Sequence, residues 1–192
     1  MDMFNKYCGV DRDPRGVVRL TICNAGSLNI LGSAVTDGVR EGLEALAADR
    51  DIRALVLAGQ GEKSMIGGAD IKEMATLDQT SARAFITRLR DLCEAVRAFP
   101  APVIARMPGW CLGGGLEVAA ACDFRIAAHD AMFGMPEVRV GIPSVIHAAL
   151  LRQWEELPLK EAVNLSIEVF GQSYLTGEPQ RLMQGFIDRK RS

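Results

Sequence analysis

A run of glycines between an apolar segment and a helix-forming segment is the feature that most constrains the fold of this chain. The apolar residues Val103 to Ala105 lead into the stretch Met107 to Asp123, MPGWCLGGGLEVAAACD. This order predicts a strand, a tight backbone turn at Gly113–Gly115 and then a helix. Because glycine has no Cβ, such a turn can bring bare backbone N–H groups against a ligand. The helix begins at the same place, so its positive end favours an anionic oxygen there.

A carboxylate lies one turn inside this predicted helix. Glu117 is flanked by Leu116 and by the apolar residues 118–121, so we expect the helix to be largely buried. A buried carboxylate costs free energy unless a partner or a function compensates for it. An oxyanion-binding corner beside a carboxylate suggests acyl chemistry. Each feature alone has an ordinary reading, since three glycines are more often a flexible turn and a single glutamate is more often a surface residue.

A second glycine-rich corner follows a short apolar strand predicted at Ala54–Ala58. Its end, Gly67-Gly68-Ala69, precedes Asp70, which is suited to cap a helical turn that begins at Ile71. The earlier fragment GEKS is not a Walker phosphate loop, because glutamate stands where that motif needs glycine before lysine. The corner is therefore another place where backbone N–H groups can face a ligand.

The two corners and two glutamates together predict enolate chemistry. N–H groups of Ala69 and Gly114 can converge on one carbonyl oxygen, and losing one such donor typically costs ~2.7–4 kcal/mol of barrier. Glu117 follows one donor, and Glu137 follows Pro136 after a short extended piece at 132–134. Two carboxylates near one carbonyl can move the protons of addition and elimination beside it. Alone, Glu137 reads as a solvated loop residue, His129-Asp130 as a surface turn, and Trp110 and Cys111 as packing residues.

The order of elements predicts an α/β fold with a mostly parallel sheet. Ligands bind beyond the carboxyl ends of the strands in such sheets, where both glycine corners lie. Strands are predicted at Val17–Cys23, Ala54–Ala58, from Val103 and at Phe124–Ala127, and helices from Ser33, from Thr80-Ser81, over the glycine-led segment and from Ile142-Pro143-Ser144.

Composition excludes several classes of function. The chain has 192 residues, 48% of them hydrophobic, and a net charge of −2, so it has a globular composition and no basic surplus for nucleic acid. No apolar run is long enough to cross a bilayer, and the first residues do not resemble a signal peptide, so we expect a cytoplasmic protein. Five cysteines at irregular spacing and two histidines favour reduced, packed cysteines and no metal site.

Five segments resemble, in order and approximate spacing, the motifs of the crotonase family, the enoyl-CoA hydratases and isomerases. The resemblance runs from about Val17 to Leu150, and it implies a crotonase-like (ClpP/crotonase) α/β fold, a superhelical core of repeated ββα units with C-terminal helices. We expect the core over residues 1–151 and the helical segment over 152–192. The segments are Gly67–Met74 (GGADIKEM), Gly109–Glu117 (GWCLGGGLE), Ala121–Asp123 (ACD), Phe133–Glu137 (FGMPE) and Gly141–Pro143 (GIP).

The resemblance also implies roles for individual residues. Ala69 and Gly114 supply the oxyanion-hole N–H groups for a thioester carbonyl. Glu117 and Glu137 hold a water and add it across the 2,3 double bond of an enoyl-CoA, with Glu137 moving the proton at Cα and Glu117 orienting the water. The coenzyme A part of the substrate is gripped by backbone at Ser27-Leu28 and Ala69-Asp70-Ile71. No metal or bound redox cofactor is implied, and the family assembles as trimers or dimers of trimers.

The chain departs from the family pattern in two places. Residues 142–147, IPSVIH, stand where hydratases carry a glycine-rich run, so the acyl-chain specificity stays open. Beyond Leu150 the chain runs directly into what resembles the family's C-terminal end. We therefore hypothesise that an internal segment is missing, with the join between Ala149 and Gln153.

Alternative functions follow from the same residues. An enoyl-CoA isomerase, a dehydratase of a branched 3-hydroxyacyl-CoA and a thioester hydrolase keep the fold and change the reaction. A catalytically silent crotonase-like binding or scaffold protein is a different class, to which the missing segment gives weight. The presence of both Glu117 and Glu137 favours the hydratase.

Overall fold

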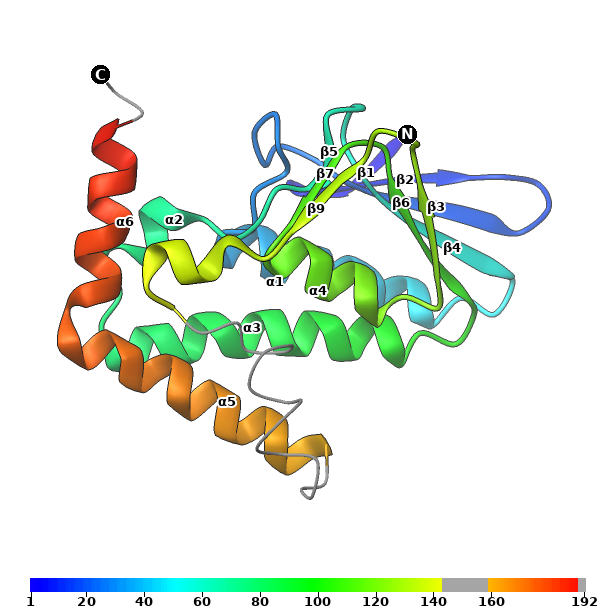
Figure 1. Cartoon of the computed structure of the whole chain (residues 1–192). Coiled ribbons are helices and arrows are strands. Elements are labelled where there is room, and N and C mark those ends of the chain that lie inside the picture. The colour runs from blue at the N-terminus through cyan, green and yellow to red at the C-terminus, as the bar shows by residue number, and fades with distance from the viewer. Residues whose placement is uncertain (143–158, 190–192) are drawn as a thin grey trace. The chain divides into compact units, whose positions relative to one another are not determined.

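The computed structural model describes residues 1–142 and 159–189 (Figure 1). Contacts divide the chain into two compact units. The first consists of Met1–Ala69 and Arg88–Gly134, and the second of Asp70–Thr87 and Met135–Ser192 within the described ranges.

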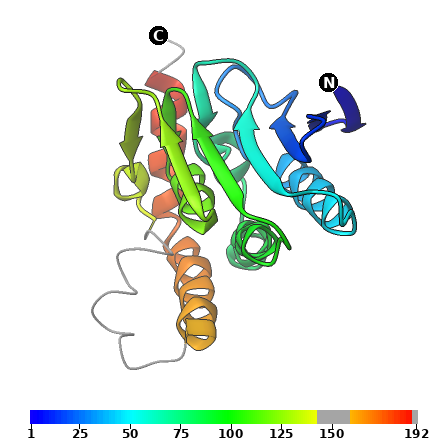
Figure 2. The same ribbon diagram turned by 90° about the vertical axis from the view of Figure 1, so that its right-hand side faces the viewer.

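A six-stranded sheet in the order β1-β2-β3-β4-β6-β8 forms the frame of the first unit (Figure 2). The first three strands pair antiparallel and the last four pair parallel, which confirms the predicted mostly parallel sheet. Leu20, Leu57 and Ala105 stand opposite one another on neighbouring strands and are fully buried. The strands are β1 (Asp2–Asn5), β2 (Cys8–Arg12), β3 (Val17–Ile22), β4 (Ala54–Gly59), β6 (Val103–Met107) and β8 (Phe124–Ala127).

Helices of the first unit cover the sheet on the side that lies below it in Figure 1. α1 (Ser33–Ala47) begins where the sequence predicts. It packs closely against β3, since a Cβ added at Gly42 would lie only 3.2 Å from Leu20 Cδ1. α4 is the glycine-led helix, Gly114–Ala121. α3 (Gln79–Arg97) belongs to the second unit as far as Thr87 and to the first unit from Arg88.

Three short parallel strands form a second sheet in the order β5-β7-β9. β5 (Ser64–Ile66), β7 (Trp110–Leu112) and β9 (Met132–Gly134) each follow a strand of the larger sheet. Strand pairs followed by a helix thus repeat along the chain, as the resemblance implies. The extended piece at β9 is confirmed, whereas β5 and β7 are strands that the sequence analysis did not predict. Both strands have only three residues and lack alternating polar and apolar positions. They form because a strand distant in sequence lies beside each of them.

The second unit is built mainly from helices, with α2 and η1 packed against α6. Gln180 Nε2 donates to Leu77 O at 3.0 Å, and Arg83 forms an ion pair with Glu168 at 2.6 Å. The expected C-terminal helices are therefore present. The helices are α2 (Ile71–Met74), α3 as far as Thr87, η1 (Pro136–Val140), α5 (Leu159–Ser173), η2 (Tyr174–Thr176) and α6 (Glu178–Arg189).

Two helix starts in this unit are fixed by aspartate side chains. Asp70 Oδ1 accepts from Lys72 N at 2.9 Å, which confirms the predicted cap of α2. α3 begins at Gln79, slightly earlier than predicted, because Asp78 Oδ1 accepts from Ser81 N at 2.7 Å and Asp78 N donates back to Ser81 Oγ. The helix expected from Ile142-Pro143-Ser144, the join between Ala149 and Gln153 and the boundary at residue 151 lie outside the described residues.

All five cysteines are buried and free, which confirms the prediction of reduced, packed thiols. Burial raises the pKa of Cys8, Cys93 and Cys122 to about 12, so these thiols stay protonated at neutral pH. Across residues 1–142 and 159–189, the helices lack the combination of length and hydropathy that a membrane span requires.

A buried asparagine that the sequence analysis did not identify joins two loops of the first unit. Asn29 is fully buried and adopts a φ of 52°, in the left-handed region that asparagine tolerates better than most residues. Its Nδ2 donates to Gln60 O at 3.2 Å and to Ser64 O at 3.0 Å. These bonds hold the turn before α1 against the start of β5.

We predict that Asn29→Asp lowers the free energy of unfolding by at least ~2 kcal/mol, because a carboxylate cannot donate to the two carbonyls and is buried beside them. Asn24→Asp is the matched control. Asn24 also has a positive φ and donates through Nδ2 to Lys6 O, but it is exposed. Urea unfolding of both variants measures the difference, and equal losses at the two positions would contradict the role given to Asn29.

Candidate functional site

The two glycine corners predicted from the sequence lie next to each other in the first unit. β5 and β7 are parallel neighbours, with Ile66 opposite Cys111, so the segments after them leave the sheet side by side. A Cβ added at Gly68 would lie 3.4 Å from Leu112 O, and one added at Gly115 would overlap Ile66 O. The backbone of each corner therefore packs directly against the strand that leads into the other.

Backbone geometry directs the N–H of Ala69. Gly68 has a φ of 113°, which L-residues rarely adopt, and its carbonyl accepts from Leu31 N at 2.9 Å. The C=O and N–H of one trans peptide point in opposite directions. The Ala69 N–H therefore points away from Leu31.

The second corner presents the first amides of α4. Gly113 has a φ of 51° and caps the helix, and its N–H donates to Gly134 O at 2.9 Å. Its carbonyl accepts from Leu116 N at 2.8 Å and from Glu117 N at 3.2 Å. The N–H of Gly114 belongs to the first helical turn, where amides have no acceptor within the helix. This amide is suited to bind an oxyanion at the positive end of α4.

Glu117 is buried in the same helix, with 4% of its surface exposed, as the apolar sequence around it predicts. α3 packs against the start of α4, where a Cβ added at Gly114 would lie 3.0 Å from Leu89 Cδ2. Cys93, one turn further along α3, is close enough for the charge of Glu117 to add to the effect of burial in raising the thiol pKa. The structure thus places a shielded carboxylate one turn behind the corner amides.

The turn expected to hold coenzyme A is joined to the first corner. Ser27 is exposed and Leu28 is half-buried. Leu28 O accepts from Gly67 N at 2.7 Å and from Ser64 Oγ at 2.6 Å. Ser27, Leu28 and Ala69 therefore belong to one connected piece of the first unit. Asp70 and Ile71, the other two residues expected to bind the coenzyme, begin the second unit.

Glu137 lies in η1 of the second unit and is more enclosed than a solvated loop residue. Its Oε2 is buried and has no hydrogen-bond partner among the described residues. Burial raises the pKa of its carboxyl above the ordinary value of 4.5, and its own backbone N–H opposes the shift. Glu117 belongs to the first unit, and the pairing of the two glutamates stays a prediction.

The other side chains considered from the sequence differ in their exposure. His129 and Asp130 are exposed, as expected of a surface turn. Cys111 is fully buried, as expected of a packing residue, whereas 42% of Trp110 is exposed, so Trp110 is not a core residue. Within the described ranges, groups of three or more His, Cys, Asp or Glu arranged to hold a metal do not occur.

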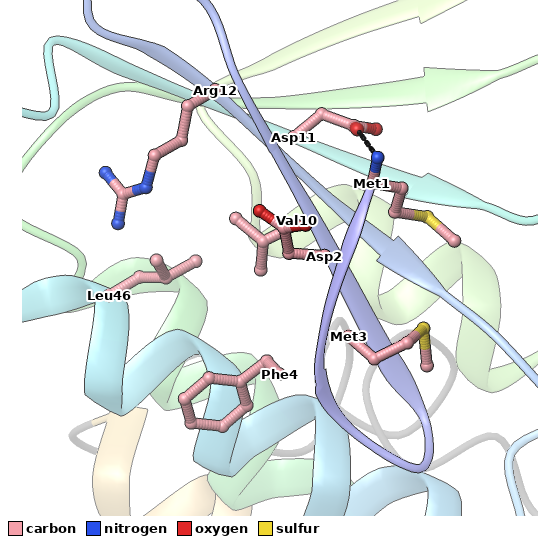
Figure 3. A pocket seen from close by; sticks show the side chains of 8 residues that line it. All are labelled: Met1, Asp2, Met3, Phe4, Val10, Asp11, Arg12 and Leu46. Atoms are coloured by element: carbon pink, nitrogen blue, oxygen red, sulfur yellow. Dashed lines mark ion pairs between the residues drawn. The ribbon is translucent and has the colours of Figure 1, made fainter.

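An open hollow of about 500 Å³ lies elsewhere in the first unit, between β1, β2 and α1 (Figure 3). Phe4 and Leu46 line its apolar side, and the amine of Met1 pairs with Asp11 at 2.7 Å. The predicted site residues do not line it, so it is not the site described above.

Arg125, at the end of α4 opposite the corner, is a residue that the sequence analysis missed. It stands on β8, just beyond α4, and its Nη1 donates to carbonyls at the end of that helix. A basic residue shortly after the last helical position is the signal that identifies such a contact in a sequence.

The chain was compared with known proteins. A family model described as enoyl-CoA hydratase/isomerase matches residues 12–174. The mitochondrial enoyl-CoA hydratase domain-containing protein 2 of Bos taurus is 36% identical over 71% of this chain and 46% of its own length. The crotonyl-CoA hydratase of Syntrophomonas wolfei is 39% identical over 60% of this chain and 45% of its own length. The chain thus spans about half the length of these curated relatives.

Solved structures show the same fold. The structure of DspI from Pseudomonas aeruginosa superposes with a TM-score of 0.68 at 37% identity, over 75% of this chain and 58% of that one. The ββα arrangement that repeats along the chain is therefore a crotonase-like fold. With the family model matching most of its length, the chain belongs to the enoyl-CoA hydratase/isomerase family.

Proposed function

We propose that the protein is an enoyl-CoA hydratase, which adds water across the 2,3 double bond of an enoyl-CoA thioester. One observation carries the proposal. The ends of β5 and β7 bring Gly68-Ala69 and Gly113-Gly114 together, and the buried Glu117 follows on the same helix. Membership of the family and the names of the relatives support this choice of reaction.

In this proposal the thioester carbonyl oxygen binds between the N–H groups of Ala69 and Gly114. Addition of water places negative charge on that oxygen as an enolate forms. Preorganised backbone donors stabilise the charge as it develops, and each is typically worth ~2.7–4 kcal/mol. The positive end of α4 adds to the effect at the Gly114 amide. In the proposed chemistry the corner lowers the barrier through backbone N–H groups, and neither a metal ion nor a redox cofactor takes part.

The two glutamates divide the proton transfers. Glu117 orients the water and takes one of its protons while the hydroxyl adds to the β-carbon. Glu137 delivers a proton to Cα as the enolate collapses, so the net reaction is the addition of one water. The raised pKa of Glu137 suits a proton donor, because it retains a proton at a higher pH than an ordinary glutamate does.

The coenzyme A part of the substrate is held by backbone. We assign Ser27 and Leu28 to its pantetheine and adenine portion, together with Ala69, Asp70 and Ile71. The bonds from Gly67 and Ser64 to Leu28 O support this assignment, because they fix the turn relative to the corner. A substrate that binds both the turn and the corner then has its coenzyme and its carbonyl held by connected parts of the backbone.

Glu117→Gln tests the role of the first carboxylate. We predict that kcat for crotonyl-CoA falls at least ~100-fold, because a general base typically contributes 10²–10⁴-fold. The measurement is the loss of enoyl-thioester absorbance. Glu41→Gln, an exposed position on α1 of the same unit, is the control and keeps wild-type activity. A Glu117→Gln protein that is folded and retains activity within threefold of wild type would remove Glu117 from the mechanism.

Glu137→Gln tests the buried second carboxyl through the pH dependence of stability. The folded pKa of Glu137 is raised, so the folded protein binds this proton more tightly than the unfolded chain does. Its contribution to stability is therefore present below the ordinary value of 4.5 and is lost as pH rises through the folded pKa. We predict that Glu137→Gln gains stability relative to wild type as pH rises through this window.

Urea unfolding of wild type, Glu137→Gln and the control Glu161→Gln from acidic to neutral pH measures this effect. Glu161 is exposed at the start of α5 in the same unit. Parallel stability curves for wild type and Glu137→Gln would show that burial does not perturb this carboxyl.

A further inference from the structure

Arg125 binds the C-terminal end of the helix that carries the proposed oxyanion amide. Its Nη1 lies 2.8 Å from Cys122 O, 3.2 Å from Ala119 O and 3.4 Å from Ala120 O. These carbonyls belong to the last turn of α4 and to the residue that caps it. One guanidinium nitrogen therefore serves three acceptors at one helix end.

The last carbonyls of a helix have no partner within it, and they form the negative end of the helix dipole. A cation there both satisfies the acceptors and opposes the dipole. α4 has eight residues, so at a rise of 1.5 Å per residue it is only about 12 Å long. A shift at the Arg125 end is therefore transmitted to Gly114 and Glu117 at the other end.

Arg125 is itself fixed in the larger sheet. It stands opposite Ala105 in the parallel pairing of β8 with β6. The residue that joins α4 to β8, Asp123, donates its N–H to Val103 O at 3.0 Å and accepts from Val103 N through Oδ2 at 2.7 Å. Arg125 thus connects α4 to β6, which leads into β7 and the second glycine corner.

The opposite end of α4 is fixed separately. Gly113 N donates to Gly134 O of β9, and Gly115 packs against Ile66 of β5. The position of α4 along its own axis therefore depends on attachments at both ends. At the C-terminal end Asp123 binds β6, and Arg125 is the side chain that binds the helix carbonyls.

We propose that Arg125 is a positioning residue for the reaction, which sets the axial position of α4 and thereby keeps the Gly114 N–H and the Glu117 carboxylate in register with Ala69. The proposal rests on the hydratase function proposed above. Arg125 acts through α4 and does not touch the substrate. A displacement of about 1 Å at a reacting group can cost ~100-fold in rate, so a small axial shift is sufficient for a measurable effect.

Three variants test the proposal. Arg125→Met removes the donors and keeps the apolar stem, Arg125→Lys keeps a charge with three donors, and Arg19→Met changes an exposed arginine on β3 of the same sheet. We expect Arg125→Met to lower kcat for crotonyl-CoA at least tenfold with KM changed less than threefold. Arg125→Lys should recover most of the loss, and Arg19→Met should match wild type.

Hydrogen exchange read by mass spectrometry over residues 113–122 gives a readout that does not require activity. We expect exchange in this segment to become at least tenfold faster in Arg125→Met and to stay at the wild-type rate in Arg19→Met. If Arg125→Met does not fold, Arg125→Lys provides the same comparison with a smaller expected effect.

Faster exchange together with the loss in kcat supports the proposal. Unchanged kcat overturns it, even if stability falls, because Arg125 would then have a structural role alone. Lower kcat with unchanged exchange also overturns it, since α4 would not be the route of the effect. A wild-type protein that does not hydrate crotonyl-CoA refutes the proposed function, and exchange at residues 113–117 then decides whether Arg125 fixes the corner.

Discussion

Parallel pairing between two three-residue strands, β5 and β7, is the interaction on which the candidate site depends. The strands end together, so the glycine corners that follow them meet at one edge. Neither strand is long enough to be stable by itself. Their register is inherited from β4 and β6, which are parallel neighbours in the larger sheet and lead into them along the chain. The buried amide of Asn29 then holds the start of β5 in place.

The polarity of α4 explains how the same short helix serves both stability and the proposed chemistry. Its first amides lack acceptors within the helix and face the corner, whereas its last carbonyls accept from Arg125. Opposite ends of the dipole are thus used differently, one left available to a ligand and the other neutralised by the protein. Glu117 lies between these two ends and is buried, so its carboxylate is shielded from water as an exposed residue of the same helix is not.

The sequence predicted those elements whose signal is local. The strands β3, β4, β6 and β8 and the helices α1 and α4 follow from apolar runs, periodicity and the glycines at the helix starts. The hairpin of β1 and β2 and the strands β5 and β7 did not follow, because a strand of a few residues is specified by its partner and not by its own composition. For the site, the Gly68-Ala69 and Gly113-Gly114 corners and the buried Glu117 were predicted. Asn29 and Arg125 were not, since each acts on residues whose proximity only the fold creates.

Close backbone packing at the corners also limits how this protein can change by mutation. A Cβ at Gly115 would overlap Ile66 O, and one at Gly109, just before β7, would overlap Lys63 O, so even alanine meets a main-chain oxygen at these positions. No change of rotamer relieves an overlap with backbone. Single substitutions at these two glycines therefore require the backbone to move. In the proposed hydratase, a new substrate preference arises from side chains around the corner, such as the exposed Trp110, while the backbone assigned to the carbonyl oxygen stays unchanged.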